Sequence, residues 1–171
     1  KIKGNVLKKL AVLTNELPPY RRPIFERLGR YEALEVTVYL STRVEPHRMW
    51  DPAESLPRVE VKTVPSFALN AQQKQRERVI YFPIGALPAL LSQRPDAVIS
   101  SEFGLRSLLA WIYCALFHKP LIIWNGETEH SAASITSTQR TLRRFLARRA
   151  SGFLAYGQAA RRYLHRLDVD D

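Results

Sequence analysis

Polar side chains that could hold a sugar follow four apolar segments of the sequence. The loops begin near Asn15, Ser100, Asn125 and Gly157, and together they supply carboxylates, amides, hydroxyls and an arginine pair. Amide, hydroxyl and carboxylate groups exchange hydrogen bonds with a polyol, and guanidinium groups bind phosphate. The loops therefore predict a site for a sugar that carries phosphate.

The same residue types also have a structural use. Asn, Ser, Glu and Gly commonly end strands and cap the helices that follow them. For any one of these residues the structural interpretation is the simpler one. Four such loops in succession favour a site.

The apolar segments have the pattern of buried parallel strands. Five are short, and most of these are continuously apolar: 10–14, 36–40, 97–100, 121–124 and 153–156. Residues 59–64 instead alternate in polarity, which predicts a half-exposed strand near a sheet edge. Helical patterns lie at 23–28, 82–92, 105–117, 136–150 and 157–167, and a long loop is expected at 43–57.

This alternation predicts an α/β fold, a Rossmann-like open parallel sheet with helices on both faces. Ligands of such sheets bind outside the carboxyl ends of the strands. The four polar loops follow those ends, so we expect their side chains to converge on one rim. The length of 171 residues fits a single domain.

The charge of the chain is strongly positive and unevenly distributed. The sequence has 26 Lys and Arg against 16 Asp and Glu, a net charge of +10. No acidic residue lies between His130 and Leu167, and eight arginines do: Arg140, Arg143, Arg144, Arg148, Arg149, Arg161, Arg162 and Arg166. Such a block predicts an anionic partner, either nucleic acid, phospholipid head groups or a phosphorylated substrate, unless it is simply a solvated face.

Four of these arginines are expected on one face of the helix at 136–150. Leu142, Phe145 and Leu146 form the apolar stripe of that helix, and the opposite face carries Arg140, Arg144 and Arg148 with Arg143 beside them. No carboxylate is expected to neutralise this face. We expect it to bind an anionic membrane surface if the substrate is lipid-linked.

Several classes of site and location are not indicated. One cysteine, Cys114, and four histidines cannot build a disulfide framework or a zinc site, and Cys114 is expected to be a small buried side chain. Asp168 and Asp170 form an Asp-x-Asp pattern that we interpret as coincidence, so no metal ligands are predicted. No secretory signal is visible and the longest apolar stretch is too short to span a bilayer, which predicts a cytoplasmic location.

Three motifs, in their order and spacing, resemble bacterial family 4 retaining glycosyltransferases, which have the GT-B fold. They are Asn15-x-x-Pro18-Pro19-Tyr20-Arg21-x-Pro23-x-Phe25, then Trp124-x-Gly126-Glu127-Thr128 followed by the Arg-rich helix, then Tyr156-Gly157-x-x-Ala160-x-x-Tyr163-Leu164. The similarity extends over nearly the whole chain.

The resemblance implies transfer of a hexosyl group from a nucleotide-sugar to a hydroxyl of a glycan or lipid-linked acceptor, as in polysaccharide biosynthesis. It implies retention at the anomeric carbon and no metal or other cofactor besides the donor substrate. Residues 1–171 would form the single acceptor-side domain, peripheral at the inner face of the membrane. The donor-binding domain, with the family's paired glutamates, would lie outside this chain, so the chain alone is expected to be inactive.

The resemblance also implies roles for individual residues. The loop with Pro19, Tyr20 and Arg21 would face the donor phosphates and the acceptor, with Arg21 neutralising the leaving diphosphate. Further substrate-binding positions are Asn15, Glu102, Asn125 and Thr128, and Glu127 is the catalytic candidate that orients the acceptor hydroxyl. Arg21 and Arg22 stand where many members carry two glycines, so either guanidinium groups replace the backbone contact or the loop does not touch phosphate.

Two other classes of protein are alternatives. The charge of +10 would suit a nucleic-acid-binding α/β module, although no recognition motif and no basic strand pair interleaved with aromatics is present. A free-standing flavodoxin-like nucleotide-binding domain would share the strand pattern but normally has a Gly-rich phosphate loop, which this sequence lacks.

Overall fold

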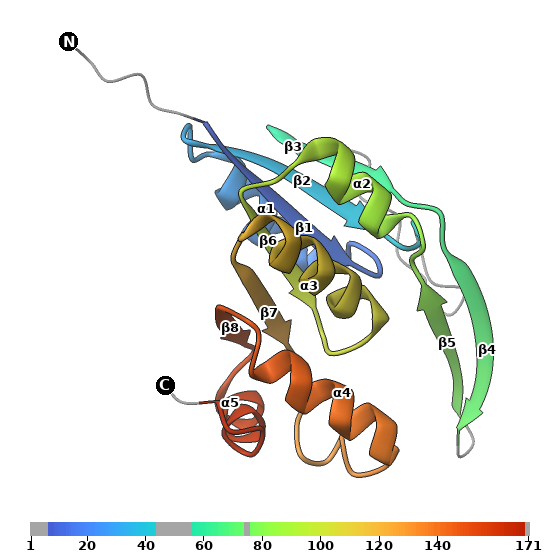
Figure 1. Ribbon diagram of the computed structural model, residues 1–171. Helices are drawn as coiled ribbons and strands as arrows, with labels where there is room; N and C mark the ends of the chain where they lie inside the picture. Colours follow the sequence, from blue (N-terminus) through green and yellow to red (C-terminus); the bar gives the residue numbers. More distant parts are fainter. Residues whose placement is uncertain (1–6, 44–55, 74–75, 170–171) are drawn as a thin grey trace. The chain divides into compact units, whose positions relative to one another are not determined.

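The computed structural model describes residues 7–43, 56–73 and 76–169 (Figure 1). Helices alternate with parallel strands, so the predicted Rossmann-like α/β class is confirmed. The chain divides into two compact units, Lys1–Asp96 and Ala97–Asp171. Most of the long loop expected at 43–57 lies outside the described residues.

The first unit contains three parallel strands, β1 (Lys8–Thr14), β2 (Leu34–Leu40) and β3 (Val59–Thr63). They lie in the order β3-β2-β1, with Leu13 opposite Tyr39 and Leu40 opposite Thr63. The strand with the alternating pattern, β3, is therefore outermost in its row, as its polarity predicts. Because the strands are parallel and in register, their carboxyl ends share one edge.

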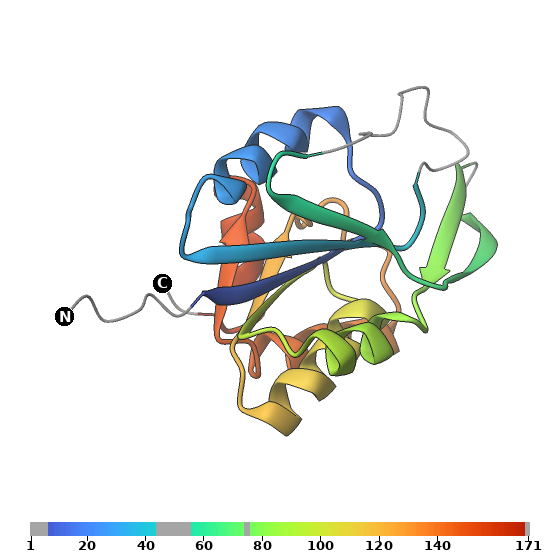
Figure 2. The same ribbon diagram turned by 90° about the horizontal axis from the view of Figure 1, so that it is seen from above.

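Two helices cover this row of strands. The short 3-10 helix η1 (Pro19–Arg21) leads into α1 (Arg22–Gly29), and α2 (Ala86–Gln93) follows later in the chain. Figure 2 shows α1 and α2 on opposite faces of the strands. Phe25 of α1 is fully buried, and Gly29 ends this helix where a Cβ atom would lie 2.6 Å from the carbonyl oxygen of Pro57. Glycine thus permits the close packing of α1 at this point.

A β-hairpin between β3 and α2 was not predicted from the sequence. Strands β4 (Phe67–Gln73) and β5 (Arg76–Phe82) pair antiparallel, and they occupy residues up to the expected start of a helix at 82. The helix instead begins at Ala86, because Pro83 follows the last hairpin strand and a turn separates it from α2. Phe67 and Leu69 of the hairpin are exposed.

The second unit repeats the alternation with β6 (Ala97–Ser101), β7 (Leu121–Asn125) and β8 (Gly152–Ala155) in the order β6-β7-β8. Its helices are α3 (Leu105–Phe117), α4 (Ser137–Ala147) and α5 (Gln158–His165). Helix α3 packs on β6 and β7, and α5 packs on β8.

The bounds of α3 and the start of α4 agree with signals in their sequences. Helix α3 has the predicted bounds. Helix α4 starts with a capping box, in which the Gln139 N–H donates to Thr136 Oγ1 over 3.2 Å and the Thr136 N–H donates to Gln139 Oε1 over 2.9 Å. Cys114 is buried on α3, as expected, and burial raises the pKa of its thiol to about 12.

Tyr39 of β2 is a buried phenol whose charge state links stability to pH. Only 2% of its surface is exposed, and no partner for its hydroxyl lies within the described ranges. Burial, followed by the charges of Glu60 and Glu35, raises the pKa of Tyr39 from 10.0 to about 12. In the unfolded chain the phenol would lose its proton near pH 10, whereas the folded protein holds it.

The free energy of unfolding is therefore expected to fall as the pH rises from about 10 to about 12. Urea unfolding across this range should show a shallower fall for Tyr39→Phe than for the parent. Tyr31→Phe removes a hydroxyl from an exposed ring and is the matched control. If the free energy of unfolding depends on pH in the same way in the parent and in Tyr39→Phe, the raised pKa of Tyr39 is refuted.

Candidate functional site

The carboxyl ends of β6 and β7 carry the first group of predicted site residues. Glu102 follows β6 with a φ of 63°, and its N–H donates to the Trp124 carbonyl oxygen over 2.9 Å. The left-handed region is unfavourable for a non-glycine residue by about 1–2 kcal/mol, and such residues concentrate at functional sites. The side chain of Glu102 is exposed at the strand end, where a ligand could reach it.

Asn125, the last residue of β7, is fully buried. Its Nδ2 donates to the Glu127 carbonyl oxygen, and its Oδ1 accepts from the Glu127 N–H, both over 3.1 Å. These bonds close a side-chain turn of the kind asparagine favours. The structure thus shows Asn125 shaping the loop that carries Glu127, and its contact with substrate stays a prediction.

The carboxylate of Glu127 is held by two side chains. Its Oε2 accepts from Ser131 Oγ over 2.7 Å, and its Oε1 lies 3.4 Å from Nη2 of Arg143. The same Ser131 hydroxyl accepts from the N–H of Thr128 over 2.9 Å. Glu127 and Thr128 thus belong to one hydrogen-bonded turn, and the Glu127 side chain retains 12% of its exposure.

Arg143 lies at the centre of this network and corrects one expectation. Its side chain is only 8% exposed, and its Nη1 donates to Tyr163 Oη of α5 over 2.7 Å. The helical wheel placed Arg143 beside an exposed basic face, but in α4 it is buried with Leu146 and Ala147. Residues three and four apart share a helix face, and here Glu127 and Tyr163 satisfy the buried guanidinium.

The remaining basic face consists of Arg140, Arg144 and Arg148, which are all exposed. The expectation that no carboxylate neutralises it needs a second correction, because Arg148 Nη2 lies 3.5 Å from Asp168 Oδ2. Asp168 therefore has a surface partner, and Asp170 of the Asp-x-Asp pattern lies outside the described residues. No helix in the described part of the chain is both long enough and apolar enough to cross a membrane.

Trp124 and Tyr156 belong to two of the sequence motifs, but the motifs do not predict that their rings stack beside this turn. The rings of Trp124 and Tyr156 stack with centroids 5.4 Å apart and planes inclined by 12°. Gly126 lies under the Tyr156 ring, where a Cβ atom would be 3.1 Å from Tyr156 Cδ2. Trp124 is buried and Tyr156 is exposed, so Tyr156 is the accessible member of the pair, directly after β8. The available signal was an aromatic residue close to a glycine at the ends of β7 and β8, Trp124 before Gly126 and Tyr156 before Gly157.

The other predicted residues lie in the first unit, in the loop after β1. Arg21 Nη1 donates to Thr14 Oγ1 over 3.0 Å, and the guanidinium carbon lies 6.0 Å from the centroid of the Tyr20 ring. Pro19 and Tyr20 are exposed, and the carbonyl oxygen of Asn15 accepts from the N–H groups of Ser41 and Thr42. The structure thus gathers Asn15, Pro19, Tyr20 and Arg21 at the carboxyl end of β1.

The sequence matches no known protein-family profile and no curated protein. Solved structures do resemble the chain. HepE from Anabaena in complex with UDP is 14% identical, with a TM-score of 0.57, over 95% of this chain and 41% of that protein. UDP-GlcNAc 2-epimerase from Methanocaldococcus jannaschii is 12% identical, with a TM-score of 0.52, over 95% of this chain and 43% of that protein.

A third similar structure is a putative UDP-N-acetylglucosamine 2-epimerase from Listeria monocytogenes, 12% identical with a TM-score of 0.53, over 95% of this chain and 43% of that one. The epimerases share the GT-B fold with glycosyltransferases. The likeness therefore supports the predicted fold over nearly the whole chain, which spans less than half the length of these proteins. The resemblance to glycosyltransferase family 4 stays a prediction.

Proposed function

We propose that this chain is the acceptor-side half of a GT-B glycosyltransferase that moves a hexosyl group from a nucleotide-sugar to a hydroxyl of a glycan or lipid-linked acceptor. The observation that carries the proposal is the likeness, over 95% of the chain, to proteins whose names specify UDP or UDP-sugars. The three motifs and their spacing favour transfer among the reactions of this fold. We assign the protein to polysaccharide biosynthesis on the same basis.

In the proposed reaction the protein mainly positions the substrates and stabilises the charge that develops on the leaving group. Arg21 would neutralise the diphosphate that leaves the sugar, because a guanidinium at a developing charge lowers the barrier. With retention at the anomeric carbon, the leaving phosphate can accept the proton of the acceptor hydroxyl. No metal or cofactor besides the donor is part of this proposal.

Glu127 keeps a proposed role in orienting the acceptor hydroxyl. Arg143 and Ser131 fix its carboxylate on a short turn, and a side chain fixed in this way needs little reorganisation during reaction. Glu102 offers a second, exposed carboxylate on the same unit. Asn125 would act through Glu127 as a positioning residue.

Epimerisation is the second candidate, because two of the similar structures are described as UDP-GlcNAc 2-epimerases. Release of nucleoside diphosphate separates the two reactions. The protein that carries this chain should release it from a nucleotide-sugar only when a hydroxyl acceptor is present. Release that does not depend on any acceptor would count against transfer.

The exposed basic face defined by Arg140, Arg144 and Arg148 is expected to bind anionic vesicles. Each cation near such a surface contributes about 1 kcal/mol before salt screening. Cosedimentation with vesicles of phosphatidylglycerol should weaken steeply with salt, and Arg140/Arg144/Arg148→Ser should lose most of it. Arg22/Arg27/Arg30→Ser removes equal charge from the other unit and is the control. Equal losses in both triple variants would indicate a general charge effect instead of a docking face.

A further inference from the structure

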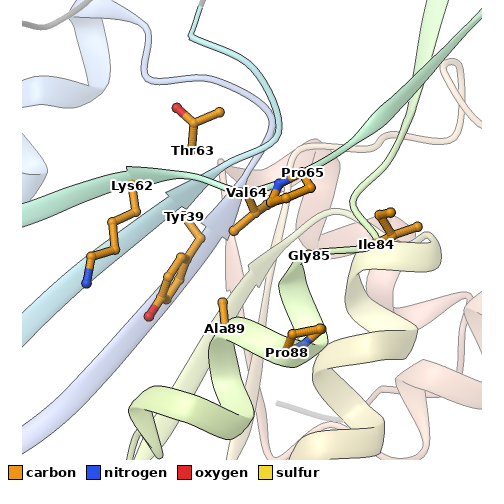
Figure 3. A pocket seen from close by; sticks show the side chains of 9 residues that line it. All are labelled: Tyr39, Lys62, Thr63, Val64, Pro65, Ile84, Gly85, Pro88 and Ala89. Atoms are coloured by element: carbon orange, nitrogen blue, oxygen red, sulfur yellow. The ribbon is translucent and has the colours of Figure 1, made fainter.

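A pocket of about 580 Å³ lies in the first unit between the ends of β2 and β3 and the start of α2 (Figure 3). Its volume is within the range of about 300–1,000 Å³ that is typical of small-molecule sites. The lining is mostly apolar and comes from Val64, Pro65, Ile84, Pro88 and Ala89. Within this unit the pocket lies at the carboxyl edge of the strands, the edge that also carries the Arg21 loop.

Two of the polar groups that line the pocket lie together, whereas the Thr63 hydroxyl points away from them. Figure 3 shows the Tyr39 hydroxyl and the Lys62 ammonium directed toward the same side, whereas Pro65, Ile84 and Pro88 lie on the other. The Tyr39 hydroxyl is buried and has no hydrogen-bond partner among the described residues. A buried hydroxyl without a partner is costly. A ligand oxygen placed there would recover that cost.

The charges around Tyr39 restrict the ligand class. Lys62 is already paired with Glu60, Nζ to Oε2 over 2.8 Å, and the carboxylates of Glu60 and Glu35 both act on the phenol. The Lys62 cation is therefore balanced by Glu60, and Glu35 adds a second carboxylate that acts on the phenol. An anionic ligand group would be repelled, whereas a neutral oxygen can accept from the phenol.

We propose that this pocket binds the uncharged apolar part of the acceptor: a ring system or short hydrocarbon with one hydroxyl or carbonyl oxygen that accepts from Tyr39 Oη. Its use as an acceptor site rests on the proposed glycosyl transfer. Binding of such a molecule to the pocket does not depend on glycosyl transfer, because the pocket lies wholly in this unit and needs no donor.

Isothermal titration of the protein with 2-naphthol, without nucleotide-sugar, tests the site. Tyr39→Phe is expected to weaken 2-naphthol binding about three- to tenfold, the usual effect of one hydrogen bond. Tyr31→Phe should leave it unchanged. Ala89→Leu, which fills the pocket, should weaken binding more than tenfold. Ile84→Glu changes an exposed lining residue, is expected to fold normally, and should also weaken binding.

The anionic analogue 2-naphthoate is expected to bind more weakly than 2-naphthol. Binding of 2-naphthol that is unaffected by Tyr39→Phe, Ala89→Leu and Ile84→Glu would overturn the site, as would undetectable binding by the folded parent. Equal or tighter binding of 2-naphthoate would overturn the neutral ligand class. Because no donor is present, absence of transferase activity would leave these binding results intact, and would reject only the acceptor assignment.

Discussion

Replacing Arg143 with alanine is expected to lower the free energy of unfolding by about 3–5 kcal/mol, the usual cost of removing one partner from a buried ion pair. The substitution leaves the Glu127 carboxylate largely buried without its cation and removes the hydrogen bond to Tyr163. Urea unfolding measures the change. Arg144→Ala, one residue along the same helix but exposed, should stay within about 0.5 kcal/mol of the parent.

A double substitution separates the ion pair from simple packing. Arg143→Met retains much of the side-chain volume, and combining it with Glu127→Gln removes both charges. Because replacing a whole buried pair is often nearly neutral, the double variant should be more stable than Arg143→Met alone. If Arg143→Ala and Arg144→Ala have equal effects, the buried network does not exist in solution.

The second large effect concerns activity. In the protein that carries this chain, Arg21→Ala is expected to lower kcat for sugar transfer by about 100-fold or more, the usual loss when one charge-stabilising donor is removed. The hydrogen bond to Thr14 that is lost with it lies at the carboxyl end of β1, and the Thr14 hydroxyl keeps its bond to the Glu16 carbonyl oxygen. Initial rates at saturating donor and acceptor measure the change.

Arg22→Ala is the matched control for Arg21→Ala. Arg22 is the adjacent arginine, but its guanidinium is exposed and forms an i,i+4 ion pair with Glu26, Nε to Oε1 over 2.7 Å. Its removal should reduce the rate by less than about threefold, since surface pairs contribute little. Equal losses in both variants would mean that the loop needs positive charge in general and that Arg21 has no specific role.

Much of the fold was predictable because its signals are local. Each of the five mostly apolar segments overlaps a strand, since a strand covered on both faces is apolar at most positions. Helix α3 was predicted with the correct bounds because an apolar run of its length ends at His118, which takes a left-handed C-cap conformation with a φ of 52°. The β4–β5 hairpin was missed because polar residues interrupt its strands and a proline follows them.

The candidate site was only partly predictable, because the sequence shows which residues follow strands but not where their side chains point. The sequence indicates Asn125 and Glu127 as candidates but not their partners: Asn125 is buried and bonds to the backbone of its own loop, and Glu127 is held by an arginine 16 positions later. A helical wheel cannot show that a guanidinium on the edge of the apolar stripe has a buried partner. Long-range pairing of this kind is a property of the tertiary structure.

The most direct test of the proposed function is the identity of the product. The protein that carries this chain is incubated with an α-linked nucleotide-sugar and a hydroxyl acceptor, and the product is followed by proton NMR at the anomeric position. We predict a new α-glycosidic linkage to the acceptor together with free nucleoside diphosphate. A sugar of changed configuration that is still attached to the nucleotide, with the acceptor unmodified, would contradict it.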